Sequence, residues 1–279
     1  MMNILVTLDR GYVYPLCAML RSLADSNRDD CITVYVAHSA LTEYDFRQMR
    51  FSVYGSDIRL VSLKVDPSLF ENAPTKHRIT KETYYRLLAP AYLPKNVDRI
   101  LYIDPDTVIL NPISEFYFTD FDGDMIIAAK HFDGITDRWN KFRLSLEKSE
   151  HYINAGVMLM DINAMRSYIT PQGVFDCVRK NRSRLFLADQ DAVNIIYDGK
   201  IGTLEEKLIN FDERCFRRLL KNMSEEEALG EVRRNTVIVH FDGKYKPWKP
   251  DYKGSMKCFF DMYSSPNTKR RRFDLDEGA

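Results

Sequence analysis

The sequence predicts an α/β protein whose mostly parallel sheet is flanked by helices on both faces. Short, continuous apolar runs that are rich in branched residues alternate with longer segments of helical periodicity. The runs lack polar interruptions, which is typical of strands that are buried on both faces. No Gly/Ser-rich linker and no internal repeat divides the 279 residues, so we expect both halves to share one continuous fold with a sizeable core.

The first half of the chain alternates regularly between strand and helix. Residues 2–8 are the first apolar run, and residues 12–27 then carry apolar side chains at helical spacing, with Pro15 early enough for a first turn to tolerate it. The same reasoning predicts strands at 31–38, 58–65 and 98–104 and helices at 42–53 and 81–93. Strands that alternate with helices in this way indicate parallel pairing.

The second half is less regular. Its expected elements are strands at 124–131, 153–162 and 236–241 and a helix at 190–199. Residues 253–279 are expected to form a last helix and a charged tail. For the tail, a solvated and frayed end is one interpretation, and a weak contact with anionic lipid at the inner face of a membrane is the alternative.

Charge and cysteine content narrow the function classes. The chain has 40 basic and 40 acidic side chains, whereas a duplex nucleic-acid binder would normally show a basic excess, so we expect no nucleic-acid partner. Its five cysteines are scattered without a C-x-x-C pair, which indicates a reduced, cytoplasmic chain. The N-terminus lacks the features of a signal peptide, and no apolar run approaches the roughly 20 residues needed to span a bilayer. Nothing in the sequence indicates an oligomeric state.

Two aspartates follow the strand expected at 98–104. Asp104 and Asp106, with Pro105 between them, lie where ligands bind in open α/β sheets, at the carboxyl ends of the strands. Asp9, just after the first strand, is expected to share that crevice. Together with Val108 the pair fits a phosphatase of the haloacid dehalogenase type, with the first Asp as nucleophile, and equally a nucleotide-sugar transferase that holds a divalent cation. An ordinary turn is a third interpretation.

The rest of the chain favours the transferase. A phosphatase needs further spaced acids downstream, and the later strands offer mainly aliphatic residues. The segment VIVHFDGKYKPW instead supplies His240, whose imidazole could complete a cation site; such a mixed N/O set suits Mn²⁺ better than Mg²⁺. Gly243 would let the backbone approach a phosphate, and Lys246 would bring a positive charge to a leaving diphosphate. Taken alone, the segment also fits a strand that ends in a loop, with Trp248 as a core anchor.

With these motifs the chain resembles glycosyltransferase family 8, whose retaining hexosyltransferases include lipooligosaccharide galactosyltransferases and glycogenin. The resemblance runs from residue 3 to about residue 250. It implies a GT-A fold, Mn²⁺ or Mg²⁺ as cofactor, UDP-glucose or UDP-galactose as donor, and a saccharide or glycolipid acceptor. A single domain, 1–252, would hold the nucleotide with residues 1–110 and the sugar and acceptor with residues 111–252. The implied metal ligands are Asp104, Asp106 and His240, and the implied diphosphate ligands are Gly243 and Lys246.

Two further segments resemble the family's nucleotide site. In VTLDRGYVY, Thr7 and Asp9 would contact uracil and ribose, and Tyr12 would stack on the base. Relatives often carry Asn at the position of Gly11, so this contact differs here. In RITKETYYRL, Arg86 would reach the donor sugar and diphosphate, and Ile79 would form an apolar wall.

Two more segments resemble the sugar site. In YINAGVMLMDI, Asn154 would bind sugar hydroxyls, and Ala155 and Gly156 would leave room for the hexose; a glycine bulge in a strand is the plainer interpretation. In ADQDAVN, the implied catalytic residues beside Lys246 are Asp189, on the donor hydroxyls, and Gln190, on the β face of the anomeric carbon. Asp191 is expected to cap or brace the helix that begins there.

The resemblance also bears on mechanism and specificity. Retaining hydrolases use a carboxylate nucleophile, whereas Gln190 is an amide, which favours departure and attack on one face with a UDP oxygen as base. Galactose-transferring relatives often carry Asp where this chain has Lys130 and His131, so glucose is the favoured donor. Residues 132–151 are expected to form a variable lid over the acceptor.

Two other functions remain open alternatives. A nucleotidyltransferase that makes UDP-sugars would need a Gly-rich basic loop after the first strand, and TLDRGYVY is not one. A catalytically silent UDP-binding module would have no need of the metal ligands, Lys246 and Gln190.

Overall fold

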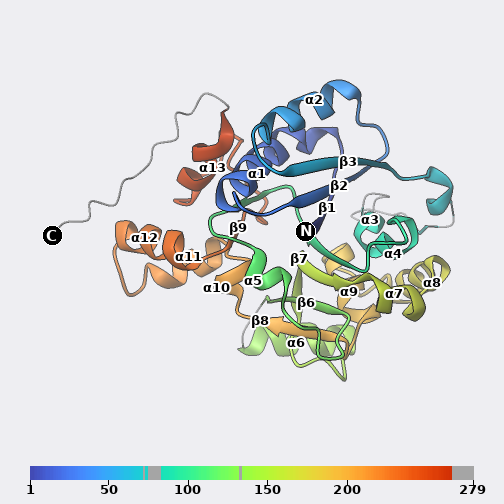
Figure 1. Cartoon of the computed structure of the whole chain (residues 1–279). Helices are drawn as coiled ribbons and strands as arrows, with labels where there is room; N and C mark the ends of the chain where they lie inside the picture. The colour runs from blue at the N-terminus through green and yellow to red at the C-terminus, as the bar shows by residue number, and fades with distance from the viewer. Residues whose placement is uncertain (72, 75–82, 132–133, 266–279) are drawn as a thin grey trace.

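The computed structural model describes residues 1–71, 73–74, 83–131 and 134–265. Seven strands form one sheet in the order β3-β2-β1-β4-β7-β6-β8 (Figure 1). Every neighbouring pair in it is parallel except the two pairs that involve β7. The predicted α/β class with a mostly parallel sheet is therefore confirmed. The strands are β1 (Met2–Thr7), β2 (Ile32–His38), β3 (Ile58–Lys64), β4 (Arg99–Ile103), β6 (Ile126–Lys130), β7 (Ile153–Asp161) and β8 (Ile201–Leu204).

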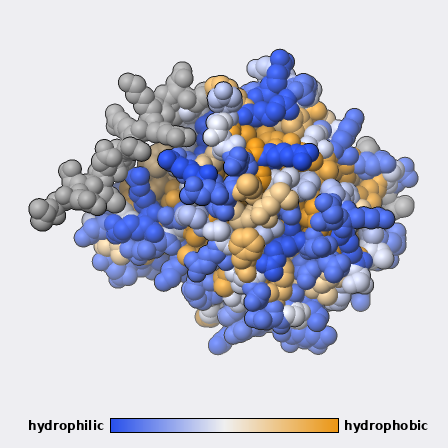
Figure 2. Space-filling view, in the orientation of Figure 1, coloured by the Kyte–Doolittle hydropathy of each residue, from blue (hydrophilic) through white to orange (hydrophobic). Residues whose placement is uncertain are grey.

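The sheet is buried on both faces because neighbouring residues of its strands point into different cores. Leu5 of β1 and Tyr102 of β4 pack on one face, under α3 (Thr83–Leu87), α4 (Ala89–Tyr92), α7 (Ile162–Tyr168), α8 (Pro171–Asn181) and α9 (Ala188–Ile196). Ile4 and Leu101 pack on the other face, under α1 (Val13–Ser26) and α2 (Glu43–Ser52). This arrangement explains why the strand sequences are continuously apolar. Hydrophilic side chains cover most of the face in Figure 2, with smaller hydrophobic patches between them.

The helices of the first half lie near their predicted positions, with one correction. The single helix predicted at 81–93 is two short helices in the described residues. Pro90 causes the break, because it has no N–H to bond to the carbonyl of Arg86. The helical elements here are η1 (Arg10–Tyr12), α1 (Val13–Ser26), α2 (Glu43–Ser52), η2 (Pro67–Phe70), α3 (Thr83–Leu87) and α4 (Ala89–Tyr92).

The second half contains more helix than the sequence predicted. The helix expected at 190–199 is α9 (Ala188–Ile196). The segment expected to be a lid, 132–151, contains α6 (Gly134–Leu144). Other helices of this half are α5 (Ser114–Tyr117), α7 (Ile162–Tyr168), α8 (Pro171–Asn181), α10 (Glu206–Ile209), α11 (Glu213–Leu219), α12 (Glu225–Asn235) and α13 (Lys257–Ser264).

A separate two-stranded ribbon brings the end of the chain back to the sheet. The strand predicted at 236–241 is β9 (Ile238–His240), and it pairs antiparallel with β5 (Thr107–Ile109). A third core forms around this ribbon, with α11, α12 and α13 packed against it. Among the described residues, no helix is long and apolar enough to cross a bilayer.

Candidate active site

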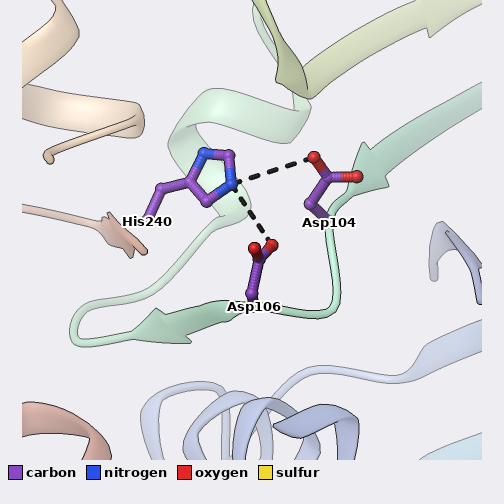
Figure 3. Close-up of side chains that lie close together, drawn as sticks. All are labelled: Asp104, Asp106 and His240. Carbon is purple, nitrogen blue, oxygen red and sulfur yellow. Dashed lines mark ion pairs between the residues drawn. The ribbon is translucent and has the colours of Figure 1, made fainter. Parts of the chain in front are cut away.

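The two aspartates and His240 meet where β4, β5 and β9 come together (Figure 3). Asp104 follows β4 directly, and its backbone N–H donates to the carbonyl of Gly156 in β7, at 2.8 Å. Asp106 precedes β5. Because β5 pairs with β9 in a register that sets Thr107 opposite His240, the imidazole arrives beside Asp106 although it lies far along the sequence.

The three side chains are close enough to share one cation. His240 Nε2 lies 3.3 Å from Asp106 Oδ1 and 3.8 Å from Asp104 Oδ2. One ligand atom from each residue lies within 4.8 Å of the other two. Bonds from a hard cation to oxygen are roughly 2.0–2.6 Å long, so these separations fit a single ion. Two carboxylates with one imidazole are a donor set that suits Mn²⁺.

A hydrogen bond sets the orientation of His240. Its Nδ1 lies 2.8 Å from the side-chain oxygen of Asn210, which can only accept, so Nδ1 carries a proton and Nε2 faces the carboxylates. Burial opposes a charge on this ring, but Asp106, with smaller contributions from Asp242 and Asp104, outweighs burial, and together they raise the pKa of His240 to about 8. Asn210 has no local sequence signal, because only the tertiary structure brings it to the histidine.

Arg86 neutralises Asp104. Its Nη2 donates to Asp104 Oδ1 at 2.8 Å, its Nη1 donates to the carbonyl of Ala155 at 3.0 Å, and Tyr102 donates a further hydrogen bond to Asp104. Arg86 Nε also lies 2.8 Å from Asp189 Oδ2, as an ion pair without hydrogen-bond geometry. Burial raises the pKa of Asp104, against the lowering effect of Arg86. One guanidinium therefore connects the end of β4 to the start of α9.

Lys246 pairs with the second aspartate. Its Nζ lies 2.6 Å from Asp106 Oδ2 and donates to the carbonyl of Phe241 at 2.6 Å. Burial opposes ionisation of Asp106, but His240 and Lys246 outweigh it and hold its pKa below the usual range. The loop after β9 therefore places a positive charge beside Asp106, and the predicted contact of Lys246 with a diphosphate stays a prediction.

Gly156 leaves room for the cluster of Asp104, Asp106 and His240. A Cβ at this position would lie 2.2 Å from His240 Cε1 and 2.9 Å from Asp104 Oδ2, both too short for real contacts. The predicted role of Ala155 and Gly156 was to leave room for the hexose. The neighbours of Gly156 are instead the cluster itself, so in this structure the lack of a side chain first serves His240.

We expect Gly156→Ala to displace His240 and to cost about 1–3 kcal/mol of stability, because the added methyl overpacks a buried site. Stabilisation of the fold by Mn²⁺ with UDP should also be lost, which thermal melts with and without both ligands measure. Gly230→Ala in α12 is the matched control: its nearest neighbour is the end of Arg234 at 3.3 Å, and it should keep the ligand-induced shift. An unchanged shift in Gly156→Ala would contradict this role.

The start of α9 is held by a buried polar network. Asp191 is fully buried; it accepts two hydrogen bonds from Arg143, at 2.8 and 2.9 Å, and one from the backbone N–H of Leu187 at 2.8 Å. The prediction that Asp191 braces this helix is confirmed. Ala188 adopts φ +41°, a left-handed conformation that costs a non-glycine residue roughly 1 kcal/mol. The network holds the turn that aims Asp189 and Gln190 at the cavity.

The same network determines which end of the Gln190 amide faces outward. Tyr152 donates its hydroxyl hydrogen to Asp191 at 2.7 Å, because an arginine-bound carboxylate can only accept. The hydroxyl oxygen then accepts from the Gln190 amide NH₂ at 3.0 Å. The amide oxygen of Gln190 is therefore the end that remains for the cavity.

A cavity of about 340 Å³ collects these groups. It brings together most of the predicted metal and sugar ligands, and it adds residues that the sequence did not single out as ligands. The predicted residues in its wall are Arg86, Asp104, Asp106, Asn154, Gly156, Asp189, Gln190 and His240. The others are His131, Phe186, Leu187, Ala188 and Asp242.

The predicted nucleotide contacts lie outside this wall. Thr7 hydrogen-bonds to Tyr102 at 3.1 Å, and Asp9 accepts from the backbone of Gly11 at 2.7 Å. The ring of Tyr12 meets that of Trp248 edge to face, with centroids 5.9 Å apart. Burial and then the charge of Asp106 raise the pKa of Tyr12, which indicates that its hydroxyl lies near the charges of the site.

Three predicted residues remain without a tested contact. Ile79 lies outside the described residues. A Cβ added to Gly243 would have no atom of the described residues within 4 Å, apart from its own chain neighbours. Pro105 forms the link between the two aspartates.

A second group of potential metal ligands beside the cavity is already neutralised. His131, Glu206 and Asp212 lie close together, but Arg214 pairs with Asp212 at 2.6 Å and also with Glu206. Arg218 makes a further ion pair with Glu206, at 2.6 Å. Arg214 also donates to His131 Nδ1 at 2.9 Å, so all three side chains of this group are bonded to guanidinium groups and form a structural network that fixes His131.

Comparison with known proteins identifies the family. The model of the family Glycosyl transferase family 8 matches residues 3–251. The chain belongs to this family. It is a family 8 glycosyltransferase, which confirms the resemblance seen in the sequence and excludes the phosphatase interpretation.

Relatives of this glycosyltransferase share about a quarter of its residues. General stress protein A of Bacillus subtilis is 26% identical, over 95% of this chain and 93% of that protein. A lipopolysaccharide 1,3-galactosyltransferase of Salmonella typhimurium is 23% identical, over 88% of this chain and 72% of that protein. The structure of galactosyltransferase LgtC with donor and acceptor sugar analogs superposes with a TM-score of 0.77 at 23% identity, covering 94% of this chain and 95% of that one. The fold is therefore of the GT-A type, as predicted.

Proposed function

We propose that this glycosyltransferase moves a hexose from UDP-glucose or UDP-galactose to a hydroxyl of a saccharide or glycolipid acceptor, with Mn²⁺ as cofactor and with retention of the α configuration. The observation that carries the proposal is the convergence of Asp104, Asp106 and His240 in one cavity with Arg86 and Gln190. Residues 1–110 would hold the nucleotide, and residues 111–252 the sugar and acceptor.

Each end of the cavity suits one part of a nucleotide sugar. A cation held by the carboxylates and the imidazole would stabilise negative charge on the diphosphate. Lys246, which is already charged beside Asp106, would add to that stabilisation, and Gly243 leaves space for a phosphate. Thr7, Asp9 and Tyr12 would bind the uridine on the side of β1.

The hexose would lie against α9 and β7. Asp189 of α9 and Asn154 of β7 both line the cavity and offer polar atoms for its hydroxyls. The amide oxygen of Gln190 would face the anomeric carbon, where a partial negative charge stabilises an oxocarbenium-like transition state. Because an amide is a poor nucleophile, the acceptor would attack on the face from which UDP departs, with a UDP oxygen taking its proton.

The donor sugar favoured by the sequence is glucose. His131 lies in the cavity wall, and Lys130 pairs with Glu205 at 3.1 Å. Neither position supplies a carboxylate to an axial hydroxyl. Slow hydrolysis of a panel of nucleotide sugars with Mn²⁺ tests the function: release of UDP from UDP-hexoses supports it, and a panel without turnover favours a silent UDP-binding module.

We expect Mn²⁺ to bind weakly alone and about 10- to 100-fold more tightly with UDP, because three protein ligands leave the shell incomplete until the diphosphate joins it. Affinity should fall as the pH drops below about 8, since a proton on His240 Nε2 then competes with the cation. Titration calorimetry at several pH values measures both effects. Equal Mn²⁺ affinity with and without UDP would exclude the shared shell.

A further inference from the structure

Helix α6 buries two polar residues and exposes three large apolar ones, while Leu144 at its end is buried. Asp137 and Asn140 are buried, and Asp137 accepts a hydrogen bond from the backbone N–H of Tyr152 at 2.8 Å. Ile135 and Phe142 are each 85% exposed, and Trp139 is 51% exposed. A surface helix normally shows the opposite arrangement. Ile135, Trp139 and Phe142 therefore do not serve the core, unlike Leu144.

These exposed side chains form one stripe. Ile135, Trp139 and Phe142 are spaced by four and then three residues, so they lie along one face of α6. The stripe continues onto the segment before α9, because the ring centroids of Trp139 and Phe186 are 6.1 Å apart. Phe186 and Leu187, exposed by 49% and 41%, also line the cavity. We call these five residues the apolar rim.

The apolar rim is rigid at its centre. The guanidinium carbon of Arg143 lies 5.1 Å from the centroid of the Trp139 ring and 4.6 Å from that of Phe186. Its N–H groups are fixed by the buried Asp191. A surface that is held in place in this way needs little reordering to bind a partner.

Basic side chains accompany the rim. α6 carries Arg138, Lys141 and Arg143 against a single carboxylate, Asp137, which is buried. Arg138 is exposed, and it lies on the face of the stripe, three residues after Ile135 and four before Phe142. Arg184, also exposed, precedes Phe186 by two residues. The rim therefore presents apolar tips among positive charges.

This combination fits an anionic bilayer better than a second copy of the chain. A stable dimer buries about 800 Å² per partner over roughly 20–30 residues, far more than five side chains provide. Interfacial helices that lie on membranes have exposed Trp, Phe or Leu together with Lys and Arg. Tryptophan is also favoured at the level of the lipid headgroups.

We propose that the apolar rim docks the glycosyltransferase on an anionic lipid bilayer, with the mouth of the cavity facing the membrane surface. Ile135 and Phe142 enter the acyl boundary, and Arg138 and Arg184 contact the lipid phosphates. The link to catalysis rests on the proposed function, since a glycolipid acceptor would then meet the cavity at the bilayer surface. In Figure 1, α6 lies at the lower edge of the molecule and α13, which precedes the basic tail, at the upper left, so the rim and the end of α13 mark different sides.

Co-sedimentation of the full chain with vesicles tests the proposal. Vesicles of phosphatidylcholine with phosphatidylglycerol should bind the protein, and phosphatidylcholine alone should bind it less. The double substitution Ile135→Ser, Phe142→Ser should lower binding roughly tenfold or more, because two apolar side chains then stay in water. Phe51→Ser with Tyr54→Ser is the matched control, since these residues are 66% and 90% exposed outside the rim and should not matter.

Fluorescence gives an independent readout. The chain has two tryptophans, and Trp248 packs against Phe260 with ring centroids 5.5 Å apart. A blue shift on adding anionic vesicles should therefore come from Trp139 and should be absent in Trp139→Phe. No donor or acceptor is present in these experiments, so their result does not depend on the proposed transfer reaction.

Three results would overturn the proposal. The first is unchanged vesicle binding in the Ile135/Phe142 variant. The second is binding that disappears when Lys269, Arg270, Arg271 and Arg272 are replaced by glutamine while the rim variant still binds, because the tail would then be the attachment. The third is a dimer in solution that the rim variant abolishes. Slow UDP-hexose hydrolysis should be equal in the rim variant and the unmodified chain, which shows that the variant is folded.

Discussion

We expect the substitution Asp104→Asn to abolish turnover of the donor. The substitution keeps the size of the side chain but removes one of the two carboxylates of the cation site. Stabilising the charge on a leaving group with a cation is worth several kcal/mol, which corresponds to a loss of about 10³-fold in rate. The fold should survive, because burial and the adjacent charge of Asp106 raise the pKa of Asp104, and a neutral amide relieves both unfavourable effects.

The loss of turnover in Asp104→Asn should not result from unfolding, because Arg86 keeps its other partners. After the substitution it still has Asp189 at 2.8 Å and the carbonyl of Ala155 at 3.0 Å, so its charge is not left unpaired. We therefore expect a melting temperature close to that of the unmodified chain, without the rise that we expect Mn²⁺ with UDP to cause in the unmodified chain. UDP release and thermal melts measure the two effects.

Asp242→Asn is the matched control for the first prediction. It removes a carboxylate from the same cavity wall but from outside the cluster of three, so the metal-dependent thermal shift should remain. Normal UDP release in Asp104→Asn would remove this residue from the cation site. A phosphomonoesterase activity that disappears in the same variant would contradict this role of Asp104.

Lys246→Ala slows transfer by roughly 10²–10³-fold in our second prediction, which is typical for the loss of one preorganised charge in a transition state. Burial opposes the charge on Lys246, but Asp106 at 2.6 Å outweighs it and raises its pKa, so the ammonium is present in the active protein. Charge builds up on the diphosphate as it departs. The loss should therefore appear in kcat at saturating donor more than in KM.

The neighbouring lysine provides the control for this prediction. Lys244 lies in the same loop, is exposed, and has its Nζ 5.5 Å from the Tyr245 ring centroid. Lys244→Ala should leave kcat within about twofold. Lys246→Arg should restore part of the rate, because a planar guanidinium places its charge differently from an ammonium.

Thermal melts show whether a slow Lys246→Ala variant has lost stability or only catalytic rate. Removing the lysine leaves Asp106 with His240 as its remaining cation, so we expect a modest loss of stability beside the large kinetic effect. A kcat equal to that of the unmodified chain would mean that Lys246 only supports the loop, and it would weaken the assignment of the segment from His240 to Trp248.

Apolar runs predicted the central strands of the sheet because those strands are buried on both faces, whereas the partly exposed edge strand β8 was not predicted. Ile4 and Leu5 pack into different cores, so both must be apolar, and the resulting run is visible without any tertiary information. Local chemistry also indicated the start of α9, where Asp191 accepts a hydrogen bond from the backbone N–H of Leu187. The sequence did not predict the break between α3 and α4, although Pro90 lies there, because the helical periodicity of the apolar residues continues across the break. The reversed direction of β7 has no local signature.

The sequence alone determined the chemistry of the site, and the tertiary structure determined its geometry. Asp104 and Asp106 are two residues apart in the sequence, so their spacing was a local signal, and His240 was predicted from its own motif. That these residues meet depends on the pairing of β5 with β9, a contact between distant segments that no local pattern specifies. The same is true of Asn210, which orients the imidazole, and of the Tyr152 hydroxyl, which orients Gln190. The local sequence determines which side chains lie on each face of a helix or strand. Their contact partners are determined by tertiary packing, which depends on the whole chain.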